Sequence, residues 1–270
     1  MTKIANARMY SVTPAVESIW QDLLARIARA AGVPLSYVPY PAPQPLETLW
    51  ARPDLGCVFM CGHPIALKLA DVVPIAAPIP SVAWAGGQPL YRSELIVRRD
   101  SAFHTLEDTF GGTAGWTVEH SHSGFNAFRH HLMAYRTPAR PKLYREMRGN
   151  LVTARKILDS VLDGSIDVGP LDGYWHSLIA KHLPGLTKDI RVVASTALAP
   201  IPAFVASSNM HPAQIQRLQD AFINASAESW FVPMRQALLI DGFARVSQSS
   251  FTKTLDWDAE AKASGYAFPA

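Results

Sequence analysis

Cysteine is almost absent from this sequence. The 270 residues contain two cysteines, Cys57 and Cys61, which excludes the disulfide framework that stabilises many small secreted domains. On an extended segment their Cα atoms would lie roughly 13 Å apart, farther than the ~7 Å that a disulfide can span. The sequence therefore favours two buried free thiols, and a metal or nucleophile site at Cys61 and His63 is the alternative.

Long hydrophobic runs and blocks of like charge are also missing. The longest apolar stretch, Val72–Pro80, contains three prolines and is too short to cross a bilayer, so we expect no membrane insertion. The formal net charge is +3, and the basic residues are scattered rather than clustered, so nothing indicates a nucleic-acid partner. The first ten residues lack the apolar stretch of a signal peptide, which makes a cytoplasmic location at least as well supported as export.

Several motifs with known chemistry do not occur. The sequence has no Gly-rich nucleotide loop, no Gly-x-Ser-x-Gly elbow and no His-x₃-His pair, so we assign no cofactor, no metal and no catalytic residue. A Ser–His–Asp nucleophile system stays open as an alternative.

What the sequence does contain is an alternation of short apolar runs and helical patterns. This alternation predicts an α/β protein in which each lobe has a mixed, mostly parallel sheet flanked by helices. Thr13 and Pro14 mark the start of a helix over 14–31, and further helices are expected over 64–69, 150–162 and 172–182. Strands are expected over 112–118 and 143–147, among others. Two α/β lobes follow, one of residues 1–90 plus 196–270 and the other of residues 91–195, with crossings at 90–99 and 190–195.

The turns at the ends of the predicted strands are where ligands bind in open parallel sheets. These turns are rich in hydroxyl, imidazole and aromatic groups; they are Tyr10–Thr13, Cys61–His63, Glu119–Gly124 and Asp172–Trp175. We therefore expect a small ligand to bind in a cleft between the two lobes.

Ser121–Gly124 is the most informative of these turns. Two serines and a glycine at the start of a helix can form an oxyanion cradle, because the first N–H groups of a helix are unpaired and lie at its positive end. The alternative is that Ser121 only caps the helix and Ser123 is solvated.

Other candidates each have a structural alternative. Tyr91 could donate its phenol to a ligand or be a half-buried strand residue. Asp172 could meet a ligand cation or only cap a helix, and Tyr174 could form a wall of the pocket.

Three segments together resemble the PhnD-type solute-binding proteins of phosphonate, phosphite and phosphate ABC importers. They are Tyr91–Val97, Ser121–Gly124 and Leu158–Asp172, which contains Asp163–Gly169; Asp54–Ala66 and Leu106–Asp108 also resemble the family. The resemblance implies a type II periplasmic-binding-protein fold with a double-strand hinge. It also implies that Ser121, His122 and Ser123 hold the ligand oxygens. The same resemblance implies that Tyr91 lines the site.

The sequence also departs from the family pattern. His122 stands where the family has a small residue, and Gly149–Leu151 replaces a Gly-Ser-His segment. The predicted ligand-binding residues are Tyr10, His63, Tyr91, Ser121, His122, Ser123, Asp172 and Tyr174.

The first functional hypothesis is a solute-binding protein that clamps a small phosphonate-like or phosphate-like oxyanion, with an ABC-transporter permease as the expected partner. The second is a cytoplasmic enzyme of the same fold, a lyase, decarboxylase or synthase, in which His63 or His122 would transfer a proton. The sequence does not determine the oligomeric state.

Overall fold

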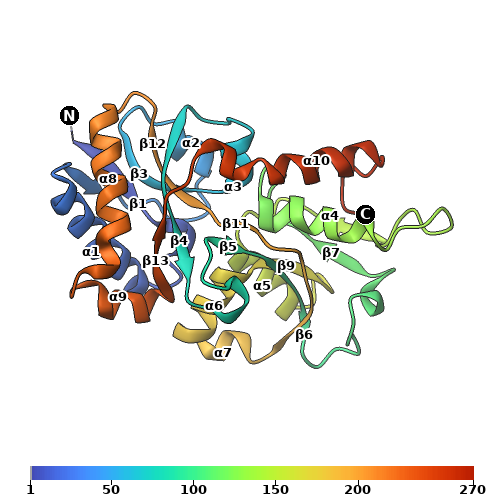
Figure 1. Ribbon diagram of the computed structural model, residues 1–270. Helices are drawn as coiled ribbons and strands as arrows, with labels where there is room; N and C mark the ends of the chain where they lie inside the picture. Colours follow the sequence, from blue (N-terminus) through green and yellow to red (C-terminus); the bar gives the residue numbers. More distant parts are fainter. Residues whose placement is uncertain (1) are drawn as a thin grey trace. The chain divides into compact units, whose positions relative to one another are not determined.

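The structure is a computed structural model that describes residues 2–270 (Figure 1). The chain divides into two compact units. Unit 1 contains the chain up to Leu90 together with Pro200–Thr252, and unit 2 contains Tyr91–Ala199 together with Lys253–Ala270. Each unit combines strands and helices, which confirms the predicted α/β class.

Unit 1 is built around a six-stranded sheet in the order β13-β4-β12-β3-β1-β2. Its strands are β1 (Lys3–Asn6), β2 (Leu35–Tyr37), β3 (Leu55–Met60), β4 (Val72–Pro80), β12 (Ala203–Ser207) and β13 (Ile240–Ala244). Its helices are η1 (Arg8–Tyr10), α1 (Pro14–Ala31), α2 (Leu46–Trp50), α3 (Gly62–Ala66), η2 (Ala83–Ala85), α8 (Pro212–Asn224), η5 (Ala225–Ala227), α9 (Phe231–Leu238) and η6 (Gln248–Phe251).

Helix α1 has the predicted bounds because its signals are local. The hydroxyl of Thr13 accepts the N–H of Val16, Pro14 occupies the first turn, and Gly32 ends the helix with φ 60°. Trp20 lies with its ring edge against Phe59. Figure 1 shows α1 beside α8, and the two helices are in contact along this side of the sheet.

Unit 2 contains a three-stranded sheet in the order β10-β6-β9 and a separate pair, β7 with β8. Its strands are β6 (Ser93–Arg98), β7 (Thr113–Gly115), β8 (Glu146–Arg148), β9 (Gly169–Asp172) and β10 (Ile190–Ser195). Its helices are η3 (Glu107–Thr109), η4 (His122–Asn126), α4 (Ala127–Met133), α5 (Ala154–Leu162), α6 (Gly173–His182), α7 (Pro184–Thr187) and α10 (Lys253–Ala263). Two short strands, β5 (Leu90–Tyr91) and β11 (Ala199–Pro200), pair where the chain passes between the units.

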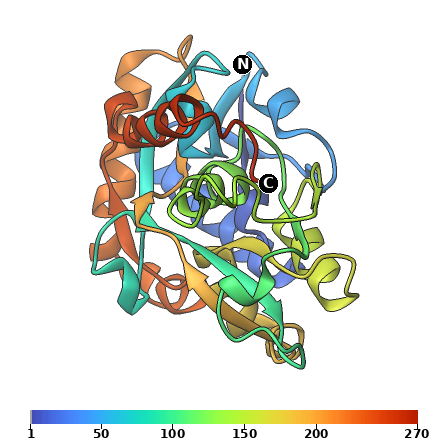
Figure 2. The same ribbon diagram turned by 90° about the vertical axis from the view of Figure 1, so that its right-hand side faces the viewer.

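The strand directions differ from the prediction of mostly parallel sheets. In unit 2, β6 pairs antiparallel with both β9 and β10, and Figure 2 shows β10 running alongside β6. In unit 1, β12 is antiparallel to β3 and β4. The reason is the connectivity: β6 and β10 are the strands by which the chain enters and leaves unit 2, so they run in opposite directions.

The end of the chain also lies elsewhere than predicted. We expected residues 196–270 in the first lobe, but Lys253–Ala270 belongs to unit 2. There α10 packs along α4, as both views show (Figures 1 and 2). The chain therefore passes between the units three times, at residues 90–91, 199–200 and 252–253.

Candidate ligand-binding site

The helix that begins after Ser121 is the centre of the candidate site. The hydroxyl oxygen of Ser121 accepts the N–H of Gly124 at 3.0 Å, and its carbonyl accepts the N–H of Asn126 at 3.0 Å. The first turn, η4, is therefore π-helical, a form found often at functional sites, and it continues directly into α4. Ser121 therefore caps the helix, which was one of the two alternatives for this residue. Its O–H can still donate to a ligand, because a hydroxyl group can accept one hydrogen bond and donate another.

Two residues that the sequence did not single out hold this helix start. The hydroxyl of Ser93 donates to the carbonyl of Ser123 at 2.8 Å, and the N–H of Thr117 donates to the carbonyl of Gly124 at 3.1 Å. A Cβ on Gly124 would lie 1.9 Å from the Thr117 hydroxyl oxygen, so only glycine fits. That oxygen is buried and has no hydrogen-bond partner among residues 2–270. Ser93 lies within the segment Tyr91–Val97 that carries the family resemblance, but only contacts across the fold reveal Thr117.

A second helix start lies next to Thr117. The N–H of Val152 donates to the Thr117 carbonyl at 3.2 Å, and the next residue, Thr153, caps α5 by accepting the N–H of Lys156 at 3.1 Å. Because Thr117 bonds to Gly124 on one side and to Val152 on the other, the starts of two helices flank it. Both helices thus bring their positive ends to this part of unit 2.

His122 is buried and packed between aromatic rings. Its ring centroid lies 6.0 Å from that of Tyr91 and 5.2 Å from that of Trp257. Its Nδ1 lies 3.3 Å from the side-chain nitrogen of Asn126. The structure thus brings Tyr91 and His122 together, as the predicted site requires, and adds Trp257 from α10.

Asp172 and Tyr174 begin the helix α6. One carboxylate oxygen of Asp172 accepts the N–H groups of Tyr174 and Trp175 at 2.9 and 3.0 Å, so this side chain is an N-cap. Asp172 pairs with Ser93 across β9 and β6, which places it beside the Ser121 helix start. Burial, followed by the charge of Asp172, raises the pKa of Tyr174 well above its ordinary value, so its phenol stays protonated.

Tyr10 and His63 lie in unit 1, at the ends of neighbouring strands. β1 and β3 run parallel, so the segments that follow them leave the sheet at the same edge. Tyr10 is buried, its carbonyl accepts the indole N–H of Trp20 at 3.2 Å, and its ring lies edge-on to Phe59. His63 is buried in α3. That Tyr10 and His63 share a site with Ser121 stays a prediction.

A cluster of charges that the sequence did not indicate lies on β6 and α6. Glu94 is buried and bonds to His176 at 2.5 Å and to Arg92 at 3.0 Å. Burial by itself raises the pKa of Glu94, but the hydrogen bonds from His176 and Arg92 outweigh it and hold the pKa below its ordinary value. Glu94 is therefore ionised at neutral pH.

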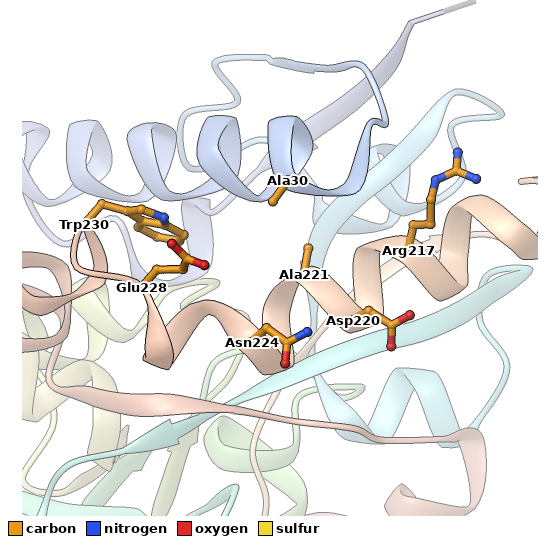
Figure 3. Close-up of a pocket in the computed structure, with 7 residues that line it drawn as sticks. All are labelled: Ala30, Arg217, Asp220, Ala221, Asn224, Glu228 and Trp230. Carbon is orange, nitrogen blue, oxygen red and sulfur yellow. The ribbon is translucent and has the colours of Figure 1, made fainter.

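One further hollow occurs in unit 1, between α1 and α8. Figure 3 shows Ala30 of α1 facing Ala221 of α8, with Arg217 and Asp220 toward one end. Arg217 donates to the carbonyl of Ala31 at 2.8 Å, and Asp220 pairs with Arg245. These charged groups hold elements of unit 1 together, so we do not place the ligand here.

Residues 2–270 show neither a metal-binding cluster nor a membrane-spanning helix. This part of the chain contains no group of three or more His, Cys, Asp or Glu side chains placed to hold a metal ion. Within the same range, no helix combines the length and the apolar character that a bilayer crossing needs. Cys57 and Cys61 are both buried and no disulfide joins them, as predicted.

Comparison with known proteins gives a family. Residues 11–251 match the model of a family described as ABC transporter, phosphonate, periplasmic substrate-binding protein. No curated protein sequence matches the chain.

Solved structures share the fold. A binding protein component of an ABC phosphonate transporter from Pseudomonas aeruginosa is 17% identical, with a TM-score of 0.80 over 98% of this chain and 88% of that one. PhnD1 from Prochlorococcus marinus, in complex with methylphosphonate, is 13% identical, with a TM-score of 0.79 over 97% and 98%. XAC2383 from Xanthomonas citri, bound to ATP, is 21% identical, with a TM-score of 0.65 over 97% and 98%.

Proposed function

Because this chain belongs to the family of periplasmic substrate-binding proteins of phosphonate ABC transporters, we propose that it binds a small tetrahedral oxyanion, a phosphonate or phosphate, and delivers it to an importer. The family match favours ligand binding over the alternative of a lyase, decarboxylase or synthase. The observation that carries the proposal is the helix start at Ser121, with its hydroxyls and the positive ends of two helices around Thr117.

The chemistry of this helix start suits an anion. Ser121 and Ser123 have half-buried hydroxyls. Apart from the N–H of Gly124, which is bonded to the Ser121 hydroxyl, the first N–H groups of the helix have no partner within it. Hydrogen bonds to a charged acceptor are stronger than those between neutral groups. The Ser121 start therefore offers several donors to the oxygens of one anion.

We assign the remaining predicted residues to the same ligand. Tyr91 and His122 border the helix start from unit 2, while Tyr10 and His63 supply the contacts from unit 1. In this proposal the ligand is clasped by both units, and binding favours the closed arrangement because only that arrangement uses contacts from both. Asp172 and Tyr174 contribute by fixing the start of α6 beside Ser93.

The family description supports a proposal for the place of action and the partner. Its members are periplasmic and belong to ABC transporters, so we propose the periplasm and a transporter permease for this chain. Fractionation of cells that express the full-length gene would give the protein in the periplasmic fraction. Recovery in the cytoplasm alone would contradict the location.

The binding proposal is tested by thermal unfolding and calorimetry with methylphosphonate, phosphate, methanesulfonate and ATP. A ligand at 100 times its Kd stabilises the protein by ~2.7 kcal/mol, which raises Tm. We expect methylphosphonate or phosphate to give such a shift. No shift with any of the four at millimolar concentration would overturn the proposal.

A variant pair locates the site. Ser123→Ala removes one hydroxyl and should weaken anion binding by about 10-fold, the value of one hydrogen bond to a charged group. Ser229→Ala, at an exposed position of unit 1, is the matched control and should bind as the unaltered protein does. If both variants bound the anion with equal affinity, Ser123 would not be part of the binding site.

A further inference from the structure

The C-terminal helix α10 contacts the candidate site through Trp257. The indole stacks on His122 with centroids 5.2 Å apart and an angle of 26°, and on His130 with 4.8 Å and 8°. The two histidines are eight residues apart on η4 and α4, which corresponds to a rise of about 12 Å. Trp257 therefore stacks on two histidines that come from successive parts of the same helical segment.

Asn126 fixes the state of His122. The Asn126 amide oxygen accepts from the guanidinium of Arg129 at 3.0 Å, and its nitrogen donates to the carbonyl of Thr254 at 2.8 Å. A guanidinium only donates and a carbonyl only accepts, so the orientation of this amide is determined. Its nitrogen, a donor, also lies 3.3 Å from His122 Nδ1. Nδ1 must then accept, and the proton of the neutral imidazole resides on Nε2.

The C-terminal segment holds this arrangement in place. Arg129 is buried, pairs with Asp258 of α10 at 2.5 Å and donates to the carbonyl of Ala267 at 2.8 Å. These partners lie beyond residue 251, where the match to the family model ends. The segment that orients His122 is therefore not part of the matched family region.

We propose that Asn126 and Trp257 are positioning residues that hold His122 as a neutral Nε2–H donor for the bound anion. This inference rests on the proposed function for the identity of the ligand. It makes His122 a specificity-determining residue: an Nε2–H donor binds a deprotonated oxygen, whereas the other tautomer would bind an oxygen that carries a proton. The anion site then accepts a fully deprotonated oxyanion.

The first test uses the full-length protein without ligand. Its histidines are labelled with ¹⁵N, and the ring signals of His122 are assigned with His122→Gln. We expect an unprotonated Nδ1 and a protonated Nε2 at pH 7. A protonated Nδ1, in either the other tautomer or the imidazolium, would overturn the proposal. This result does not depend on which ligand binds.

The second test measures the affinity for methylphosphonate in variants of Trp257. Trp257→Ala should weaken binding about 10-fold and mix the tautomers of His122, and Trp257→Phe should restore both. Trp230→Ala, which removes a half-buried indole from unit 1, is the matched control and should keep the affinity and the tautomer. Unchanged affinity and tautomer in a folded Trp257→Ala protein would contradict the positioning role.

The two tests separate the two proposals. If the unaltered protein does not bind methylphosphonate or phosphate, the proposed function fails, while the ring signals still decide the state of His122. If binding occurs but Nδ1 carries the proton, the positioning role fails and the proposed function stands.

Discussion

At the scale of single residues, the helix start at Ser121 requires a glycine at position 124. Gly124 lies against Thr117 so closely that any Cβ would overlap the threonine hydroxyl and methyl, at 1.9 and 2.8 Å. The backbone of Thr117 is itself bonded to Gly124 and Val152. The threonine therefore cannot move aside without disturbing both helix starts.

We predict that Gly124→Ala destabilises the protein by ~1–3 kcal/mol, the usual penalty of overpacking a dense interior, and weakens anion binding. Urea denaturation and calorimetry measure the two effects. Gly185→Ala is the control, because a Cβ there meets nothing within 4 Å. If Gly124→Ala were as stable as the unaltered protein, the Thr117 side chain would have to move to make room for the new methyl group.

Glu94 gives a dependence of stability on pH. Its pKa is held below the ordinary value of 4.5, since the bonds from His176 and Arg92 outweigh its burial. A carboxyl with a lowered pKa in the folded state stabilises the protein above its unfolded pKa, and this contribution is lost as the pH falls through the folded value.

We therefore predict that the free energy of unfolding decreases as the pH falls below about 4.5 and that Glu94→Gln makes this decrease shallower. Urea titrations at a series of pH values measure it. Glu228→Gln, at an exposed position, should keep the original slope. An unchanged slope in Glu94→Gln would show that the pair with His176 contributes nothing.

At the scale of elements, α10 and α4 are joined by a buried ion pair. Arg129 is 2% exposed, and its partner Asp258 is bonded to Lys262 as well. Removing the carboxylate would leave the buried guanidinium of Arg129 without its counter-charge, and such a loss costs ~3–5 kcal/mol. Exposed pairs contribute far less.

We predict that Asp258→Asn, which leaves the charge of Arg129 buried and unpaired, destabilises the protein by ~3–5 kcal/mol, measured by chemical denaturation. Arg155→Met, which breaks the exposed pair with Asp159, should cost less than ~1 kcal/mol. Similar losses for the two variants would mean that Asp258 is solvated in the folded protein.

The start of α5 was not predicted correctly from the local sequence. We predicted a helix over 150–162, but the structure begins it at Ala154. Asn150 and Val152 have φ values of 56° and 64°, a region that non-glycine residues rarely adopt. The bonds from Leu151 to Trp116 and from Val152 to Thr117 hold this conformation. Such contacts join residues far apart in the sequence, so the pattern of residues could not reveal them.

At the scale of the whole molecule, the proposed clasp predicts a change on binding. If the anion is held by both units, methylphosphonate should lower the radius of gyration in small-angle X-ray scattering. Tyr10→Phe in unit 1 and Ser123→Ala in unit 2 should both weaken binding. An unchanged radius at saturating ligand, or an effect of Ser123→Ala alone, would restrict the site to unit 2.

The sequence by itself determined the α/β class, the family and the helix starts at Thr13, Ser121 and Asp172, because alternating hydrophobic patterns and N-caps act through near neighbours in the chain. Only the tertiary structure decided the antiparallel directions of β6 and β10, the role of Thr117 and the place of Lys253–Ala270 in unit 2. The surface that a helix packs against is set by contacts with distant residues. The helix α10 contacts a helical segment that lies more than a hundred residues earlier in the chain. The state of His122 follows from the same contacts, since Asn126 is oriented by partners at both ends of its amide.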